Sequence, residues 1–159
     1  MATYKEIKGA TVRALDEDPV EFVGSWSSGG AMNTGRRDLA ATGLQTAGLA
    51  IGGFIPPYSA LTETYNGSSW TETGDLNVAK RGMASFGTYT AALVAGGYGS
   101  PTQLATAETF DGSSWTEVGD MNTARNNPEG AQYSPQTAGL IFGGYSPSAY
   151  LAITESWNG

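Results

Sequence analysis

Short apolar runs that end in a pair of glycines recur along this chain at intervals of about 45 residues. The three runs are Leu49-Ala50-Ile51-Gly52-Gly53, Leu93-Val94-Ala95-Gly96-Gly97 and Leu140-Ile141-Phe142-Gly143-Gly144. An aromatic residue follows the second glycine of each run after 12 or 13 residues, at Tyr65, Phe110 and Trp157. A repeat of this length, made of short apolar runs and turn residues, is typical of arrays and propellers rather than of single-core enzymes.

The similarity between the copies extends beyond these runs. The segment 65–77 returns almost unchanged as the segment 110–122, and a third copy begins at residue 157. Trp26 is in register with Trp70, because each lies six residues before an apolar residue that is followed by asparagine. The first copy of the repeat therefore begins at Trp26.

The alternation of polar and apolar positions predicts four strands in each repeat. In the best-defined copy they lie near Arg81–Gly87, Thr90–Ala95, Ala105–Phe110 and Ser114–Val118. The dipeptides Asn66-Gly67 and Asp111-Gly112 predict type I′ turns between the third and fourth strands. The paired glycines end the second strand, where we expect close backbone approach or an unusual φ. Apolar runs such as residues 91–95 suit strands that are buried on both faces.

Composition agrees with an all-β protein that is not an enzyme. Glycine makes up 23 of 159 residues, and charged residues are only 14% of the chain. The sequence contains no cysteine and no histidine. Disulfide frameworks, thiol nucleophiles and the commonest general base are therefore excluded, and we expect neither a cofactor nor a metal site.

Charge and hydropathy narrow the choice of partners. The net charge is −7, and the eight basic residues form no patch larger than Arg36-Arg37 or Lys80-Arg81. This balance argues against nucleic acid as a ligand. No stretch approaches the roughly 20 apolar residues of a membrane span, so we expect no membrane insertion. Residues 1–8 have no apolar signal core.

The pattern resembles the kelch repeat, in which a Gly-Gly pair is followed by a spaced tyrosine and then by a tryptophan. Gly52-Gly53 with Tyr65 and Trp70 fit it, as do Gly96-Gly97 with Phe110 and Trp115, while the last copy has Gly143-Gly144 and Trp157 but no terminal tryptophan. The resemblance covers residues 21–159 and implies an all-β, kelch-type β-propeller of four-stranded antiparallel sheets, or blades, with about three blades per chain. A propeller fold alone does not specify a function.

A second resemblance concerns the origin of the protein. The opening Met-Ala-Thr-Tyr-Lys-Glu-Ile-Lys-Gly, joined to repeats rich in Asn-Gly-Ser-Ser-Trp-Thr-Glu, is similar to kelch-like proteins of marine tailed bacteriophages. This similarity implies a virion protein made in the host cytoplasm, such as part of a tail fibre used for host attachment, with other virion proteins as partners.

The repeat divides the chain into an N-terminal arm and a set of blades. Residues 1–20 lie outside the repeat, as a disordered end or an arm that docks onto the particle. Blade boundaries are expected near 27–73, 74–118 and 119–159, with the segment 21–26 as a lone fourth strand. Three blades are fewer than the usual four to eight. Either two chains form a six-bladed ring by exchanging N-terminal strands, or the chain is a fragment of a longer propeller.

The loops between the second and third strands vary most from copy to copy, and we expect a ligand site there. They carry Phe54, Tyr58, Tyr98, Tyr145 and Tyr150, and the loops that hold Asn77 and Asn122 are expected on the same propeller face. Aromatic rings beside small polar groups suit a glycan or a protein surface. The alternative is that proline stiffens these loops and that the tyrosines pack on their own blades.

Other repeated residues have a structural and a functional interpretation. The tryptophans at positions 26, 70, 115 and 157 are expected to pack between blades, with sugar stacking as the alternative. Glu63, Glu108 and Glu155 recur once per blade, which favours a structural or surface role over a glycosidase carboxylate pair. Asp75 with Asn77, and Asp120 with Asn122, suggest turn capping rather than calcium binding. Arg36, Lys80 with Arg81, and Arg125 either hold an anion in the channel or pair with Asp75 or Asp120.

The sequence therefore favours a non-enzymatic structural or adhesive phage protein whose loops bind a host glycan or surface protein. A purely architectural capsid or tail decoration protein is the alternative, and a glycan hydrolase is a third hypothesis.

Overall fold

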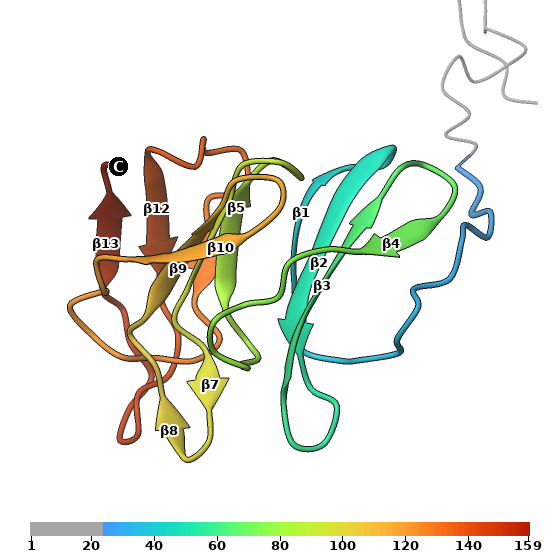
Figure 1. Cartoon of the computed structure of the whole chain (residues 1–159). Helices are drawn as coiled ribbons and strands as arrows, with labels where there is room; N and C mark the ends of the chain where they lie inside the picture. Colours follow the sequence, from blue (N-terminus) through green and yellow to red (C-terminus); the bar gives the residue numbers. More distant parts are fainter. Residues whose placement is uncertain (1–23) are drawn as a thin grey trace, which may run out of the picture.

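The computed structural model describes residues 24–159. The expected arm at residues 1–20 and the first half of the expected strand at 21–26 lie outside this range. All the regular elements within it are β-strands, so the prediction of an all-β protein is confirmed (Figure 1).

The first two repeats each form a four-stranded antiparallel sheet in which the strands follow one another in chain order. The first sheet contains β1 (Ala40–Leu44), β2 (Ala47–Gly53), β3 (Ser59–Tyr65) and β4 (Trp70–Glu72). The second contains β5 (Ala84–Gly87), β6 (Ala92–Ala95), β9 (Ala107–Phe110) and β10 (Trp115–Val118). The strands predicted for the second repeat are all present, each shortened at its N-terminal end by one to three residues.

The third repeat forms a sheet of three strands in the order β11-β12-β13. These strands are β11 (Glu129–Gly130), β12 (Gly139–Phe142) and β13 (Thr154–Trp157). A separate small hairpin, β7 (Tyr98–Gly99) with β8 (Thr102–Gln103), extends the loop between β6 and β9. The three sheets stand side by side in chain order, and residues 24–159 do not form a closed ring (Figure 1).

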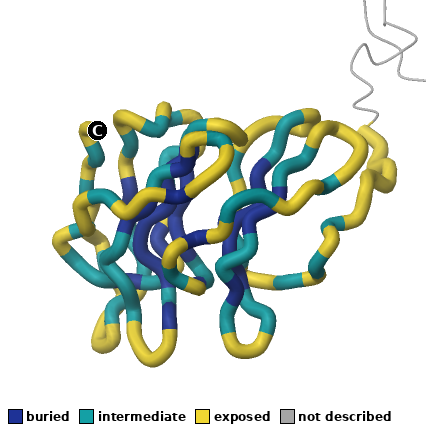
Figure 2. The backbone as a smooth tube through the Cα atoms, viewed as in Figure 1, coloured by how far each residue is buried: buried dark blue, intermediate teal, exposed yellow. Residues whose placement is uncertain are grey.

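The hydrophobic core consists of two clusters, one in each space between neighbouring sheets. Leu49 and Ile51 of β2 pack in one cluster with Val94 of β6, and Leu93 of β6 packs in the other with Ile141 of β12. Successive residues of a strand point to opposite faces, so β6 contributes to both clusters. This arrangement confirms that an apolar run such as 91–95 belongs to a strand buried on both faces, and Figure 2 shows the buried backbone concentrated in the middle of the sheets.

The paired glycines allow adjacent sheets to approach closely. Gly96 and Gly97 have φ values of 71° and 103°, and a Cβ atom on Gly96 would lie 2.8 Å from the carbonyl oxygen of Arg125. The N–H of Gly97 donates to that same oxygen, which belongs to the next repeat. Both expected reasons for glycine, close approach and an unusual φ, therefore apply.

The turns between the third and fourth strands occur where they were predicted, but they are not of type I′. Only Gly67 and Gly112 have positive φ in these turns, whereas a type I′ turn requires two such residues. The loops are four residues long, because the last strand pair is Tyr65 with Trp70 in the first sheet. The side chain of Asn66 accepts hydrogen bonds from the N–H groups of Ser68 and Ser69, which stabilises the longer loop.

The repeated aromatic residues pack as pairs beside these turns. The Tyr65 and Trp70 ring centroids are 4.9 Å apart, and the Phe110 and Trp115 centroids have the same separation. The indole N–H of Trp115 donates to Thr62 Oγ1 of the preceding sheet at 3.0 Å, which supports a packing role between sheets. Trp26 differs from them, because its side chain is fully exposed and no neighbouring strand packs against it within the described residues.

Candidate functional site

The strongest candidate site is a group of side chains from the first two repeats, which we call the aromatic cluster: Arg37, Phe54, Tyr58, Arg81 and Tyr98. Phe54 and Tyr58 belong to the loop between β2 and β3, and their ring centroids are 5.6 Å apart. Tyr98 begins the β7–β8 hairpin of the second repeat, 5.9 Å from Tyr58. The structure therefore brings together three of the predicted aromatic residues from two different sheets.

The guanidinium group of Arg81 occupies the centre of this cluster. Its Cζ atom lies 5.2 Å from the ring centroid of Phe54, 6.0 Å from Tyr58 and 5.9 Å from Tyr98. The Cζ atom of Arg37 also lies over the Phe54 ring, 4.7 Å from its centroid. Cation–π attraction orients both arginines along the aromatic surface.

Asp38 supplies an acidic group to the same surface. Arg81 Nη1 donates to Asp38 Oδ2 at 2.7 Å, and both side chains keep more than 30% of their surface exposed (33% and 41%). Asp38 has a φ of 55°, an uncommon value outside glycine. The cluster thus combines aromatic faces, guanidinium donors and a carboxylate acceptor within reach of solvent.

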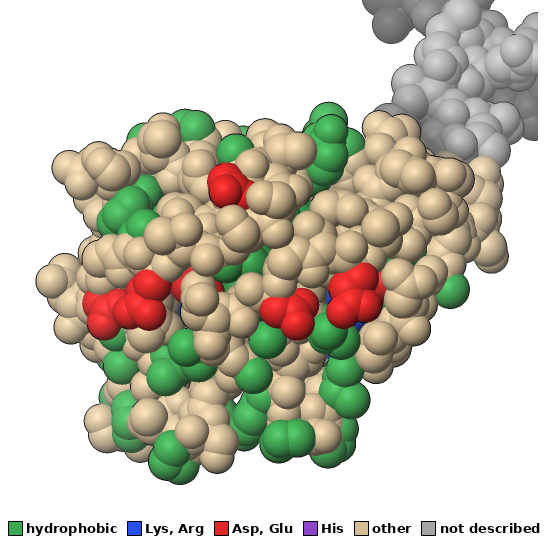
Figure 3. All heavy atoms as spheres, viewed as in Figure 1, with side chains coloured by type: hydrophobic (Ala, Val, Ile, Leu, Met, Phe, Trp, Pro, Cys, Tyr) green, Lys and Arg blue, Asp and Glu red, His purple; other side chains and the backbone are tan. Residues whose placement is uncertain are grey.

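Three features of the backbone place these side chains together. The isolated bridges Arg37 with Phe54 and Arg81 with Tyr98 join the segment before each first strand to the loop after each second strand. The N–H of Gly82 donates to the carbonyl of Asp38 at 2.8 Å and so ties the two repeats to one another. In Figure 3 hydrophobic side chains gather along the lower edge of the molecule, where Figure 1 places the β2–β3 loop and the β7–β8 hairpin.

The remaining predicted residues do not join the aromatic cluster. Tyr145 and Tyr150 form their own pair in the third repeat, with ring centroids 5.5 Å apart, and Tyr150 is 90% exposed. Asn77 is engaged by the backbone and side chains of its own sheet, since its side-chain amide donates to Glu108 and to the carbonyl of Trp115. The backbone N–H of Asn122 donates to Glu155.

A buried ion pair lies in each repeat. Lys80 Nζ is 2.9 Å from Glu108 Oε1, Arg125 Nη2 is 2.6 Å from Glu155 Oε1, and Arg36 pairs with Glu63. The cation comes from the segment before each first strand, and the glutamate comes from the third strand of the same sheet. Of the two alternatives expected for these cations, pairing with Asp75 or Asp120 was wrong, because inward-facing glutamates on the third strands pair with them instead.

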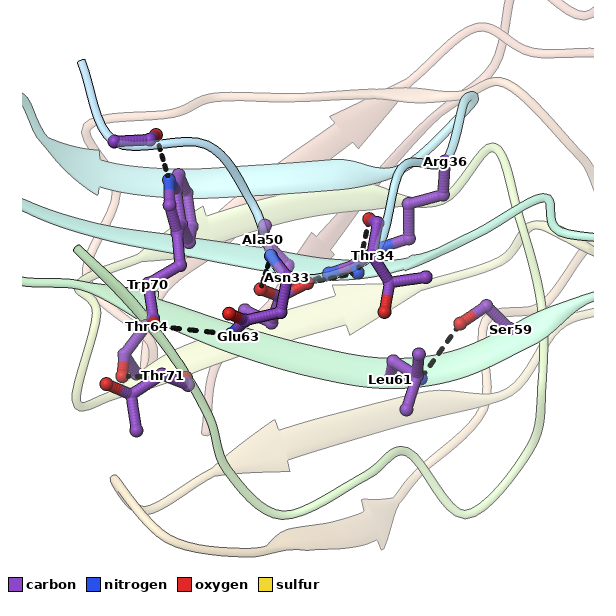
Figure 4. A network of polar contacts seen from close by, with 11 residues as sticks. Asn33, Thr34, Arg36, Ala50, Ser59, Leu61, Glu63, Thr64, Trp70 and Thr71 are labelled. Atoms are coloured by element: carbon purple, nitrogen blue, oxygen red, sulfur yellow. Dashed lines mark hydrogen bonds and ion pairs between the residues drawn. The ribbon is translucent and has the colours of Figure 1, made fainter.

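An asparagine N–H completes each ion pair. The N–H groups of Asn33, Asn77 and Asn122 donate to the second oxygen of Glu63, Glu108 and Glu155. Figure 4 shows Asn33 and Arg36 turned toward Glu63 on β3. The three glutamates therefore have a structural role, one of the two roles expected for them. The side-chain amides of Asn33 and Asn77 also donate to the carbonyls of Trp70 and Trp115, which accounts for asparagine at these two positions.

These contacts also set the charge state of Glu63. Burial acts to raise the pKa of its carboxyl group, but the N–H of Asn33, followed by the hydrogen bond and the positive charge of Arg36, outweighs burial. The pKa of Glu63 therefore lies below its ordinary value of 4.5. Glu63 remains a carboxylate near neutral pH and holds its cation in place.

A hollow lies at the end of the strands opposite the aromatic cluster, where sequence patterns gave no signal. It has a volume of about 520 Å³ and lies between the β1–β2, β5–β6 and β11–β12 connections. Leu44, Tyr89 and Tyr133 are among its lining residues. Ala47 at one end of β2 lines this hollow, whereas Phe54 follows the other end. It offers mainly apolar surface and no charged side chain.

Two further observations limit the chemistry of the described residues. Between residues 24 and 159, no group of three or more acidic side chains is arranged to hold a metal ion. The same part of the chain contains no helix of the length and apolarity that a membrane span requires.

Comparison with known proteins does not assign the chain to a family. No protein-family model matches the sequence, and no curated protein is significantly similar to it.

Proposed function

We propose that this chain is a non-enzymatic recognition module of a tailed-phage particle, built from kelch-type propeller blades, and that its aromatic cluster binds a glycan or a protein on the host surface. One observation carries the proposal: three aromatic rings from two adjacent repeats gather around the partly exposed guanidinium group of Arg81.

The chemistry of the cluster suits such a ligand. Aromatic faces bind the C–H faces of sugars and the apolar parts of protein side chains, while a guanidinium group and a carboxylate bind hydroxyl or amide groups. The rings are held by short loops on a β scaffold, so little conformational entropy is lost when a ligand binds. The net charge of −7 favours a ligand that is neutral or carries basic groups.

Two other observations support a non-enzymatic role. Each of the repeated glutamates is paired with its own cation in its own sheet, so they do not form a pair around one bond. The aromatic residues of the cluster lie in the loops that vary most between repeats, while the residues of the sheets recur. Variable loops on a constant scaffold are typical of binding sites. The phage context rests on the resemblance of the repeats and of the opening segment.

Host-cell binding of purified protein tests the proposal. We expect Tyr58→Ala combined with Tyr98→Ala to weaken binding at least about tenfold, because central aromatic residues dominate most recognition surfaces. Tyr133→Ala is the matched control, since this tyrosine is fully exposed at the opposite end of the strands. Adding Tyr145→Ala extends the test to the third repeat. Unchanged binding by all the cluster variants would contradict the proposal.

The architectural alternative makes a different prediction. A capsid or tail decoration protein anchored by residues 1–20 should disappear from particles when that segment is deleted, and the loop variants should be incorporated normally. This alternative would be favoured if the loop variants still bind host cells and if deletion of residues 1–20 removes the protein from particles.

A further inference from the structure

The third sheet exposes apolar side chains at positions that are buried in the second sheet. Leu140 and Phe142 of β12 are 40% and 41% exposed, whereas Leu93 and Ala95, their counterparts on β6, are each 1% exposed. Those counterparts pack against the third sheet. Within residues 24–159 no fourth sheet covers the corresponding face of β12.

The outer edge of the third sheet is open as well. In the first two sheets a fourth strand pairs with the third, so that Tyr65 lies opposite Trp70 and Phe110 lies opposite Trp115. No strand in the described part of the chain pairs with the outer edge of β13, where Trp157 occupies the position of Phe110. The indole N–H of Trp157 is buried without a hydrogen-bond partner among the described residues.

The segment before the first sheet carries the sequence that forms the fourth strand in the other two repeats. Trp26 is in register with Trp70 and Trp115, and its side chain is fully exposed. Four residues later, the carbonyl of Gly30 accepts a hydrogen bond from the indole N–H of Trp70 at 3.1 Å. Gly74, four residues after Trp70, is the counterpart of Gly30. It contacts the second sheet in the same way, because its N–H donates to the carbonyl of Ser113. Residues 26–30 therefore lie where the fourth strand of a preceding sheet would end.

A series of backbone hydrogen bonds points the same way. The N–H of Gly82 donates to the carbonyl of Asp38, and the N–H of Asn127 donates to the carbonyl of Gly82, both at 2.8 Å. The three residues are in register, with φ values of 55°, 60° and 50°. Within residues 24–159 the backbone carbonyl of Asn127 accepts no bond of this series, and the backbone N–H of Asp38 donates none. These two groups could pair with each other between two copies of the chain.

We propose that the exposed face of the third sheet and the outer edge of β13 dock onto a second copy of this chain. The second copy contributes the segment that begins at Trp26 as the fourth strand, and its first sheet covers Leu140 and Phe142. The register of the other sheets places Trp26 opposite Trp157 and Ser27 opposite Ser156. The same contact made in the opposite direction closes a ring of two copies. This inference is independent of the proposed recognition site.

The mass of the purified full chain in solution is the first test. Light scattering should give about twice the 16.5 kDa mass of the chain. Leu140→Asp and Trp26→Ala should each shift the protein to the monomer. Leu44→Asp should leave the dimer intact, because this exposed leucine lies on the side of the first sheet that faces the second sheet, beside Tyr89 and Tyr133. Trp26 is fully exposed and packs against no residue between 24 and 159, so its replacement should not unfold the protein. A monomeric parent chain, or an open series of larger species, would overturn the proposal.

A designed cross-link tests the register directly, because the chain contains no cysteine. The double variant Ser27→Cys with Ser156→Cys should form a covalent dimer on mild oxidation, since paired residues on adjacent strands place their Cβ atoms within disulfide distance. The double variant Ser28→Cys with Ser156→Cys is the control, because residue 28 faces the other side of the strand. An equal yield from both variants, or a disulfide within one chain, would contradict the proposed pairing.

Discussion

Lys80 and Glu108 form an ion pair inside the second sheet, with 2.9 Å between Nζ and Oε1 and almost no exposed surface on either side chain. Thr106 accepts a further hydrogen bond from Lys80, and Asn77 donates to the other carboxylate oxygen. Burial removes the hydration of both charges, so each depends on its partner.

Glu108→Gln should therefore destabilise the protein by about 3–5 kcal/mol, because it leaves Lys80 buried without a counter-charge. Urea unfolding measures this change. Glu117→Gln is a matched control, since Glu117 lies opposite Glu108 on β10 but is exposed, and its effect should stay within about 0.5 kcal/mol. Combining Lys80→Met with Glu108→Gln should recover most of the loss. Equal stability of Glu108→Gln and Glu117→Gln would show that the ion pair contributes nothing.

The lowered pKa of Glu63 predicts a loss of stability in acid. The unfolded chain binds a proton at this group near the ordinary value of 4.5, while the folded protein does so only at a lower pH. The contribution of Glu63 is therefore fully present above this value and is lost as the pH falls through the folded pKa. Urea midpoints measured from about pH 7 to pH 3 should show the gap between the parent and Glu63→Gln narrowing in acid. A difference in urea midpoint that stays constant with pH would contradict a lowered pKa of Glu63 in the folded protein.

Asp111 should titrate well below an ordinary aspartate. The N–H groups of Ser114 and Ser113, and then their hydroxyl groups, lower the pKa of its carboxyl group from 3.8 to about 2. Carboxyl ¹³C NMR should show this midpoint in the folded protein. Because the backbone N–H groups are the largest cause, Ser113→Ala combined with Ser114→Ala should leave the pKa clearly lowered. A return to the ordinary value in this variant would show that the hydroxyl groups dominate.

Gly97→Ala should destabilise the protein through the backbone. Residue 97 has a φ of 103°, and a Cβ atom there would lie 2.7 Å from the carbonyl oxygen of Arg81. The expected loss is about 1–3 kcal/mol or more, because strain and overlap add. Gly35→Ala has open space and no positive φ, so its thermal midpoint should match that of the parent. Similar midpoints for the two variants would exclude the close approach inferred here.

The strand pattern was predictable because it depends on local and repeated signals. The glycine pairs, the turns after Tyr65 and Phe110, and the strand buried on both faces at residues 92–95 all follow from short sequence windows. The turn type was not predictable, because the side chain of Asn66 stabilises a four-residue loop that competes with the type I′ turn.

The site was only partly predictable, because its contacts cross repeats. Aromatic residues in the variable loops drew attention to Phe54, Tyr58 and Tyr98, but nothing in the local sequence shows that Arg81 turns toward them while Lys80 turns inward. Two adjacent cations point to opposite sides of an extended segment, and the position of Glu108 decides which of them is buried. The recurrence of asparagine and glutamate at matched positions was the available signal for the ion pairs.

The β7–β8 hairpin has a practical consequence for protein engineering. Its two strands pair with each other, Tyr98 forms a single bridge to Arg81, and the tip at Ser100 and Pro101 is exposed. Since the entropic cost of a longer loop rises only slowly with its length, foreign peptides inserted at this tip should be displayed without disturbing the fold. The second repeat thus offers a natural insertion point for epitope display.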